Sequence, residues 1–481
     1  MHTITPDRPW PLHDGAATRR HETAAIAAAG PQVLMRRAGL ATARLALALA
    51  PHARRVWIAC GPGNNGGDGL EAAVQLQQRG KSVLVQWLGD AARLPADAAA
   101  ALQRAQAAQV PFAATPPALG PEDLAIDALL GLGGGRPVDG AIATAAAALN
   151  ACGAPVLAID LPTGLDGDTG AARGTAVQAQ HTLTVLTLKP GLFTGHGRDL
   201  SGQVWFDDLQ AGDAPPPTAW LQGPPTAAPR LYASHKGSYG DVAVLGGAPG
   251  MRGAAVLAAS AALHAGAGRV YVATLGSGNP ELATELPELM WRSPASLALD
   301  ALAIACGCGG GTAVAAVLPA VLDAAARLVL DADALNAVAA DAGLQQQLRQ
   351  RCAHGLATVL TPHPLEAARL LGGSAAEIQA DRLAAARRLA ERFGAVAVLK
   401  GSGTVVAAPG HTPVLNPTGN ARLATAGTGD VLAGLLAARL AAGDGAWEAA
   451  CHAVYRHGAL ADGWPTGRPL TAAALARAAG A

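Results

Sequence analysis

The chain has 481 residues, too many for one ordinary hydrophobic core and suited to two α/β domains of roughly 200 to 250 residues each. Lys plus Arg and Asp plus Glu both total 35, so there is no net charge to attract nucleic acid or an anionic membrane. Any phosphate must therefore be bound by local geometry. We expect small-molecule substrates, with no nucleic-acid and no membrane partner.

The positions of the cysteines and the lengths of the apolar runs indicate in which cellular compartment the protein is found. The 6 cysteines are scattered through apolar or glycine-rich sequence, which argues against a disulfide framework and favours reduced thiols. The N-terminus carries no apolar signal-like segment, and the apolar run 431–438 is far shorter than the ~20 residues of a membrane helix. We expect a cytoplasmic protein.

In the first part of the chain, short β-rich runs alternate with Ala/Leu-rich segments. Near-continuous apolar runs between helical segments predict a parallel sheet that is buried on both faces. The expected strands are 56–60, 82–88, 124–130, 155–161 and 181–188.

A glycine-rich stretch from Gly61 to Gly69 follows the first of these strands and opens a helical pattern. Glycines let the backbone approach a phosphate closely, and the adjacent Asn64, Asn65 and Asp68 can orient a ligand or an ion. A tight turn capped by asparagine is the structural alternative. Polar clusters at later strand ends, around Asp127 and from Asp160 to Thr163, favour a ligand, because open α/β sheets bind ligands outside the carboxyl ends of their strands.

These motifs, together with Lys189-Pro190-Gly191, resemble the NAD(P)H-hydrate epimerase domain over residues from about 20 to 210. The resemblance implies a potassium ion held by Asn65, Asp127 and Thr163, the last of which is usually serine in the family. Arg36 stands where glutamate is expected, which reverses a charge at that position. The residues implied to bind the hydrated nicotinamide nucleotide are Asn64, Asn65, Gly66, Gly67, Asp68, Gly131, Leu132, Gly133, Gly134, Gly135, Arg136, Pro137 and Asp160.

Epimerisation inverts one carbon of the hydrated ring, so a carbon–oxygen bond must open and re-form on the other face. A carboxylate that can carry a proton is the minimum requirement. Asp160 is the expected catalytic residue, and Lys189 is the second candidate. The alternative for Lys189 is a solvated lysine at the end of a strand.

Prolines crowd the segment 211–230 without any periodicity. We therefore predict an epimerase domain at 1–212, a linker at 213–230 and a second domain at 231–481. The alternation then resumes, and the last two expected strands flank the short turn Lys400-Gly401-Ser402-Gly403, which predicts a hairpin. The expected strands of this half are 241–245, 269–274, 301–306, 328–330, 357–360, 395–399 and 404–407.

A second glycine-rich motif, Gly427-Thr428-Gly429-Asp430, precedes an apolar helical segment whose N-terminal amides would face a transferring phosphoryl group. Asp430 would lie in the first helical turn, within reach of a hydroxyl that loses its proton as phosphate arrives. The alternative is helix capping by aspartate. Polar turns at 416–420 and 400–404 favour the catalytic interpretation.

From about residue 232 to 475 the sequence resembles the ribokinase-like superfamily and, within it, the ADP-dependent NAD(P)H-hydrate dehydratases. The matching motifs include His235-Lys236-Gly237, Asp331-Ala332-Asp333 and Thr361-Pro362-His363-Pro364. Three positions depart from the family: Met251-Arg252 stands where an aromatic residue is common, Cys308 replaces a usual proline, and Leu365 replaces a usual glycine. The resemblance implies that the hydrate contacts Ala254, Gly309, His363 and Asp430, and that the adenine nucleotide contacts Lys400, Gly401, Ser402, Gly403, Thr404 and Gly429.

The implied reaction phosphorylates the ring hydroxyl with ADP. Because phosphate leaves far more readily than hydroxide, elimination restores NAD(P)H and releases AMP and phosphate. Asp430 would be the base, and magnesium is expected with the nucleotide, although no cluster of residues indicates its ligands. Packing is the better interpretation of Cys306 and Cys308, which lack the spacing of a zinc site.

The sequence thus predicts a Rossmann-like α/β/α domain followed by a ribokinase-like α/β/α domain, in a homo-oligomer. The expected function is repair of hydrated NADH and NADPH: epimerisation of the R and S hydrates, and ADP-dependent dehydration of the S hydrate. The main alternative is a ribokinase-like kinase of a small alcohol whose N-terminal domain only binds nucleotide. A non-catalytic scaffold is disfavoured because Asp127, Asp160, Lys400 and Asp430 are all present.

Overall fold

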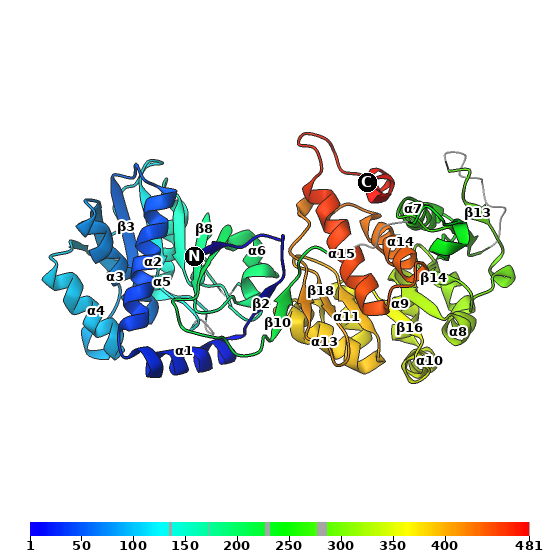
Figure 1. Cartoon of the computed structure of the whole chain (residues 1–481), viewed down its shortest axis with the longest axis horizontal. Helices are drawn as coiled ribbons and strands as arrows, with labels where there is room; N and C mark the ends of the chain where they lie inside the picture. Colours follow the sequence, from blue (N-terminus) through cyan, green and yellow to red (C-terminus); the bar gives the residue numbers. More distant parts are fainter. Residues whose placement is uncertain (134–136, 173, 227–230, 277–285, 481) are drawn as a thin grey trace. The chain divides into compact units, whose positions relative to one another are not determined.

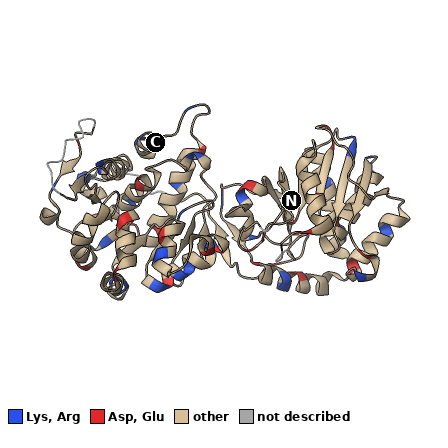
Figure 2. Ribbon diagram, turned by 180° about the vertical axis from the view of Figure 1, so that it is seen from behind, with Lys and Arg blue, Asp and Glu red and all other residues tan. Residues whose placement is uncertain are grey.

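The computed structural model describes residues 1–133, 137–172, 174–226, 231–276 and 286–480. The chain divides into two compact units: Met1–Thr5 with Trp10–Trp220, and Pro6–Pro9 with Leu221–Ala481. In each unit, helices flank a largely parallel sheet, so the expected two-domain α/β fold is confirmed (Figure 1). Basic and acidic residues alternate along the ribbon of both units, in keeping with the zero net charge (Figure 2).

The sheet of the first unit has the strand order β1-β9-β8-β7-β6-β3-β4-β5. Its strands are parallel except β1, which pairs antiparallel with β9. The chain leaves β3 for β4 on one side and returns to β6 on the other, so the carboxyl ends of β3 and β6 form a topological switch point. The strands are β1 (His2–Thr3), β3 (Arg55–Cys60), β4 (Ser82–Trp87), β5 (Phe112–Ala113), β6 (Leu124–Ala128), β7 (Val156–Ile159), β8 (His181–Val185) and β9 (Gln203–Asp207).

Helices cover both faces of this sheet because its strands are apolar on both sides. Ile58 and Ile126 belong to a core cluster with residues of α1, α2, α3 and α4, whereas Trp57 and Ala125 belong to another cluster with residues of α5. Alternate residues of one strand therefore pack against helices on opposite faces of the sheet. The helices are α1 (Gly15–Ala29), α2 (Val33–Leu49), α3 (Asn64–Gln78), α4 (Ala96–Ala107), α5 (Gly140–Ala151) and α6 (Gly197–Leu200).

In the second unit, β13, β12, β11, β14, β15, β16 and β17 follow one another as parallel neighbours. The pairs β17–β18 and β18–β19 are antiparallel, which confirms the hairpin expected around Lys400-Gly401-Ser402-Gly403. The strands are β11 (Asp241–Gly246), β12 (Arg269–Thr274), β13 (Met290–Trp291), β14 (Ala303–Cys306), β15 (Arg327–Leu330), β16 (Ala357–Leu360), β17 (Val396–Leu399), β18 (Val405–Ala407) and β19 (Val414–Leu415).

The core on one face of this sheet joins α7, α14, α15 and α16 to the strands, and α14 contacts α7 along its length. The close approach of these two helices requires Gly434, where a Cβ atom would lie 2.0 Å from the carbonyl oxygen of Ala258. The helices are α7 (Arg252–His264), α8 (Val314–Ala324), α9 (Ala332–Ala340), α10 (Ala342–Ala353), α11 (Pro364–Leu371), α12 (Ala375–Ala380), α13 (Arg382–Phe393), α14 (Thr428–Ala441), α15 (Ala446–Asp462) and α16 (Ala472–Arg477).

Short elements complete the chain. The strands β2 (Trp10–Leu12) and β10 (Ala219–Leu221) are neighbours in the strand order. Within the described ranges, no helix combines the length and the apolar character needed to cross a bilayer. The short 3₁₀ helices are Ala91–Arg93, Pro190–Phe193, Lys236–Tyr239, Pro294–Ser296, Gly311–Ala313, Ala421–Leu423 and Ala478–Gly480.

Three strands end at least two residues earlier than the sequence predicts, whereas the strand expected at 82–88 ends one residue early, at Trp87. The strands expected at 124–130, 155–161 and 181–188 stop at Ala128, Ile159 and Val185. Asp160 and Leu186 take φ values of +67° and +66°, and this left-handed backbone ends β7 and β8. Apolar residues continue beyond each strand because they line buried loops, which sequence pattern alone does not distinguish from strand.

Candidate active sites

The first candidate site lies at the switch point of the first sheet. A cavity of about 390 Å³ opens beside the carboxyl ends of the strands. Asn64, Asn65, Asp68, Asp160 and Lys189 line it, so residues expected from several separate motifs do meet. Gly131, Leu132 and Gly133 line it as well, whereas Gly134, Gly135 and Arg136 lie outside the described residues.

The glycine-rich stretch forms mostly the start of a helix rather than a loop. Helix α3 begins at Asn64, and its N-cap residue, Gly63, makes no side-chain capping bond, so the alternative of an asparagine cap is not found. Gly66 and Gly67 do not line the cavity: a Cβ atom would lie 2.0 Å from the oxygen of Gly61 and 2.7 Å from Met35, respectively. Here the absent side chains allow close packing. Pro137 is exposed and also lies outside the cavity lining.

Lys189 forms a buried ion pair with Asp160. Its Nζ atom lies 2.5 Å from Oδ1 of Asp160 and also donates to the oxygen of Val185 at 2.7 Å and to Oγ1 of Thr184 at 3.1 Å. The Lys189 side chain is 1% exposed, so the alternative of a solvated strand-end lysine is wrong. The ion pair holds the Asp160 carboxylate at the cavity wall in a single orientation.

Further carboxyl groups surround Asp160. Burial raises the pKa of Asp68 well above its ordinary value, and the nearby charges of Asp160 and Glu22 add to the effect. Burial also raises the pKa of Glu22, with Asp160 the next contributor. Like charges in one cavity disfavour full ionisation, so the surroundings of Asp160 favour proton uptake by Asp68 and Glu22. The sequence did not point to Glu22, because α1 carries no motif and meets the site only in the fold.

The residues expected to hold potassium offer oxygen ligands of the right kind. Asp127 and Thr163 are fully buried, and Thr163 donates to Asp127 through Oγ1 and through its backbone N–H, both at 2.8 Å. Asn65 borders Gly131, and its buried Nδ2 atom has no hydrogen-bond partner among the described residues. Turning that amide would present its oxygen instead. Carboxylate, hydroxyl and amide oxygens suit a hard cation, so the donor set fits the ion.

The second candidate site is built on the start of α14. Gly427 is its N-cap residue, with φ of +90° and no side-chain capping bond, so Asp430 does not cap the helix. A Cβ atom at Gly427 would lie 2.6 Å from Leu257 and 2.9 Å from Ala472, which leaves room only for glycine. Thr428 anchors the turn by donating to the oxygen of Leu423 at 2.8 Å.

Asp430 faces a second carboxylate and a thiol. Ligand atoms of Cys308, Asp331 and Asp430 all lie within 4.8 Å of one another. Burial raises the pKa of Asp430 to about 7, and the charge of Asp331 contributes. Burial also raises the pKa of Cys308 well above its usual range, so the thiol is protonated and can donate. The expectation that Cys308 only packs is therefore incomplete.

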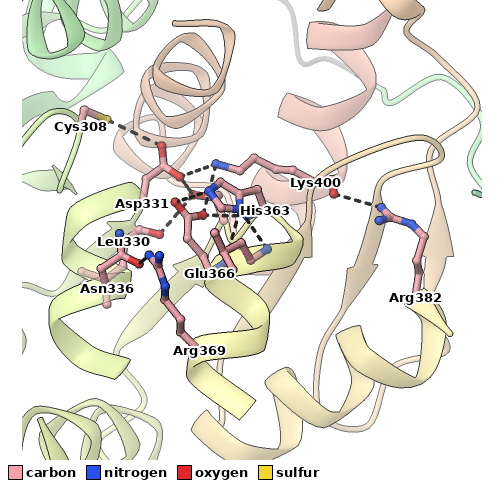
Figure 3. Close-up of polar contacts among 11 residues, drawn as sticks. Cys308, Leu330, Asp331, Asn336, His363, Glu366, Arg369, Arg382 and Lys400 are labelled. Carbon is pink, nitrogen blue, oxygen red and sulfur yellow. Dashed lines mark hydrogen bonds and ion pairs between the residues drawn. The ribbon is translucent and has the colours of Figure 1, made fainter. Parts of the chain in front are cut away.

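Lys400 joins the β17–β18 turn to this cluster (Figure 3). Its Nζ atom lies 2.7 Å from Oδ1 of Asp331 and 4.0 Å from Glu366. Burial opposes the charge of Lys400, but Asp331 and Glu366 outweigh it and raise the pKa of the lysine. A Cβ atom on Gly429 would lie 3.5 Å from Nζ of Lys400, so the two glycine-containing motifs of this half adjoin each other.

His363 lies at the edge of the same network, as Figure 3 shows. It caps α11 by accepting at Nδ1 from the N–H groups of Leu365 and Glu366, at 3.1 and 3.3 Å. Burial and then Lys400 lower its pKa, which favours the neutral imidazole. Because Nδ1 accepts both bonds, the ring proton is on Nε2, 3.2 Å from Glu366. Its side chain is 47% exposed, so it is not a packing histidine.

Ala254 and Gly309 also meet near the cluster. A Cβ atom on Gly309, whose φ is +57°, would lie 2.9 Å from Cβ of Ala254 and 2.7 Å from the oxygen of Met251. Gly309 follows Cys308 directly, so the expected hydrate contacts are brought to the Asp430 region from three separate segments.

Two residues of this site were not identified as site residues in the sequence. Asp331 directly follows β15, as Asp160 directly follows β7, and this shared strand-end position was the available signal. Arg382 is fully buried and donates from Nη2 to the oxygens of Leu399 and Lys400, both at 3.1 Å. Figure 3 shows the contact with Lys400. No sequence pattern distinguishes Arg382 from the other arginines of its helix.

The first unit thus carries carboxylates and glycines at the switch point of its sheet. The second carries a half-buried carboxylate, Asp430, in the first turn of a helix whose N-terminal amides are available to a ligand. These features define a two-site α/β enzyme of nucleotide-type substrates. A family model described as NAD(P)H-hydrate dehydratase matches residues 242–479, and one described as YjeF-related protein N-terminus matches residues 31–191.

Similar proteins match most of the chain or about half of it. A bifunctional NAD(P)H-hydrate repair enzyme of Escherichia coli (strain K12) is 38% identical over 89% of this chain and 84% of its own length. An ADP-dependent (S)-NAD(P)H-hydrate dehydratase of Neisseria meningitidis serogroup B is 45% identical over 48% of this chain and 80% of its own length. A solved ADP/ATP-dependent NAD(P)H-hydrate dehydratase of Bacillus subtilis is 32% identical, covers 53% of this chain and 92% of its own, and has a TM-score of 0.45. The chain belongs to the family of bifunctional NAD(P)H-hydrate repair enzymes.

Proposed function

We propose that this chain repairs hydrated NADH and NADPH in two steps. The first unit epimerises the R and S hydrates, and the second dehydrates the S hydrate with ADP to give NAD(P)H, AMP and phosphate. The observation that carries the proposal is the convergence of Asp430, the start of α14 and Lys400, in a chain whose relatives act on these hydrates. We propose the division of the two activities at 213–230, with the epimerase at 1–212 and the dehydratase at 231–481.

In the dehydratase site, Asp430 is the general base. Its carboxylate takes the proton of the ring hydroxyl while the hydroxyl oxygen attacks the terminal phosphorus of ADP and AMP leaves. The amides of 427–430 face the charge that develops on the phosphoryl oxygens, and Gly429 with residues Lys400–Thr404 binds the nucleotide. Phosphate then leaves from the ring carbon as the neighbouring C–H bond breaks and its proton passes to the departing phosphate, which restores the reduced nicotinamide.

The hydrate itself is held on the other side of Asp430. Ala254 and Gly309 have small side chains or none, so they leave room for the ring of the hydrate. His363 lies at the exposed edge of this pocket and offers its imidazole to the ligand. The resulting pocket contacts the ring from separate segments of the chain, which fixes its hydroxyl relative to the base.

In the epimerase site, Asp160 moves the proton. It gives a proton to the hydroxyl, which leaves as water when the carbon–oxygen bond breaks, and takes a proton back when water adds to the other face of the ring. Lys189 holds the carboxylate at 2.5 Å and keeps it in line with the cavity. Asn64, Asn65, Asp68 and the segment Gly131–Pro137 bind the rest of the nicotinamide nucleotide.

Two metal ions accompany these steps. Asn65, Asp127 and Thr163 would hold potassium, which ties three loops to one geometry beside the substrate. Magnesium would accompany the nucleotide, because it neutralises the phosphate oxygens that the protein leaves uncovered. We propose a cytoplasmic homo-oligomer, in keeping with the reduced cysteines.

One incubation tests the function. Purified protein is mixed with both hydrate epimers and ADP, and the reduced-nicotinamide absorbance, AMP and inorganic phosphate are followed together. We expect all three to rise in equal amounts until both epimers are consumed, with ADP a better donor than ATP. A small-alcohol kinase would instead leave the absorbance unchanged and accumulate a phosphorylated alcohol when given such a substrate.

A further inference from the structure

A second cavity adjoins the epimerase cavity in the first unit. Its volume is about 300 Å³, and its lining includes Gly15, Asp166 and Asp168. Arg19 and the loop Gly131–Gly133 line both cavities, so the two compartments share one wall. The functions argued above leave the second compartment without a ligand.

Helix α1 presents Arg19 to that shared wall from a firmly anchored position. Gly15 at the start of the helix donates to Oδ1 of Asp168 at 2.6 Å, and Asp14 caps the helix by accepting from Ala17 at 2.8 Å. One turn further on, Thr18 and Thr187 share a buried hydrogen bond of 2.7 Å between their hydroxyl groups. The position of the Arg19 backbone is therefore fixed relative to the sheet edge.

The guanidinium of Arg19 is available for a ligand. It makes no hydrogen bond or ion pair with any of the residues that the structure describes, although Glu22 and Asp168 are close enough for their pKa values to feel its charge. A Cβ atom on Gly15 would lie 3.3 Å both from Nη2 of Arg19 and from Leu132. The guanidinium thus lies beside the loop that divides the two cavities.

The surroundings of Arg19 are otherwise acidic. Glu22 and Asp160 line the first cavity, and Asp166 and Asp168 line the second. Among the described lining residues the other cation is Lys189, which Asp160 already engages. Among the described lining residues, Arg19 is therefore the cation that is still available to an anionic ligand spanning both cavities, whereas the carboxylates around it repel an anion.

The hydrated dinucleotide consists of two nucleosides joined by a diphosphate, so each nucleoside could occupy one cavity while the anionic diphosphate lies at the wall between them. We propose that the diphosphate contacts Arg19 and that the adenosine half occupies the second cavity. Guanidinium groups bind phosphate oxygens through two parallel N–H bonds, and carboxylates such as Asp168 accept hydrogen bonds from ribose hydroxyls. This assignment rests on the proposed epimerase function, whose nicotinamide end lies in the first cavity beside Asp160.

Arg19→Gln tests the contact, and Arg20→Gln is its matched control. Both arginines are exposed neighbours on α1, but Arg20 lines neither cavity. For Arg19→Gln we expect the epimerase KM for hydrated NADH to rise roughly tenfold to a hundredfold, the effect of losing a charge-assisted bond, with kcat changed much less. Arg20→Gln should match the unmodified protein. Arg19→Lys keeps the positive charge but lacks the planar guanidinium, so its KM should lie between those of Arg19→Gln and Arg20→Gln.

Dehydration of the S hydrate by the same chain reports whether each variant is folded, and it should be unchanged in all three. ADP-ribose, which carries the diphosphate and the adenosine half without nicotinamide, probes the second cavity directly. It should inhibit epimerisation competitively, and Arg19→Gln should weaken that inhibition by the same factor as it raises KM.

Equal KM values in Arg19→Gln and Arg20→Gln would overturn the proposal, as would the absence of competition by ADP-ribose in the unmodified protein. Either result leaves the proposed function intact when the unmodified protein epimerises its substrate. Failure of the unmodified protein to epimerise would overturn both the proposed function and this assignment.

Discussion

Replacement of Asp430 by asparagine separates the chemistry of the second site from its architecture. The amide side chain would keep the volume of the carboxylate but could not accept the hydroxyl proton. Helix α14 loses no capping bond, because Gly427 is its N-cap residue and makes no side-chain bond. We expect kcat/KM for dehydration to fall by at least ~10²-fold, or roughly 2.7 kcal/mol of barrier, which is typical of losing a general base.

The pKa of Asp430 adds a second, independent readout. The base must be ionised, and burial raises its pKa to about 7, so dehydration by the unmodified protein should rise with pH through about 7 and then level off. The residual activity of Asp430→Asn should lack this step. Epimerisation in the same chain, measured by exchange between the two hydrates, should be unaffected.

Stability should move in the opposite direction to activity. In the folded protein the pKa of Asp430 is raised from 3.8 to about 7, so ionisation of this carboxyl costs folding free energy progressively as pH rises between these values. Above about pH 7 the variant should therefore unfold at a temperature no lower than that of the unmodified protein. Dehydration at the unmodified rate, or a variant that unfolds at markedly lower temperature, would refute the reasoning.

Three further predictions concern other parts of the molecule. Asp127→Ala removes the charged member of the proposed potassium site, so with mixed epimers and ADP the S hydrate should disappear at the normal rate while R hydrate remains; rapid loss of both forms would contradict this. Lys189→Met frees Asp160 from its buried ion pair and should lower epimerase kcat by roughly tenfold or more with dehydration unchanged, whereas an unaltered kcat would show that the pair only packs. Arg382→Met removes the bonds to the oxygens of Leu399 and Lys400, so the KM for ADP should rise more than kcat falls; a drop in kcat alone would contradict a role in shaping the nucleotide turn.

The chain's architecture was largely readable from its sequence. Continuous apolar runs predicted the buried parallel strands, and the short glycine-containing turn at 400–403 predicted the β17–β18 hairpin. The positions of Asp127 and Asp160 at strand ends predicted that they would meet at one sheet edge, because parallel strands bring their carboxyl ends together. These features depend on local pattern and on rules of topology, which one sequence carries.

The electrostatics of the sites were decided only by the tertiary structure. Sequence left Lys189 as either catalytic or solvated, and only the fold brings Val185, Thr184 and Asp160 around its amino group. Similarly, the pKa of Asp430 depends on burial and on Asp331, which lies about 100 residues away along the chain. Burial and Coulomb energy depend on distances in space, and those distances between remote residues exist only once the sheets and helices have packed.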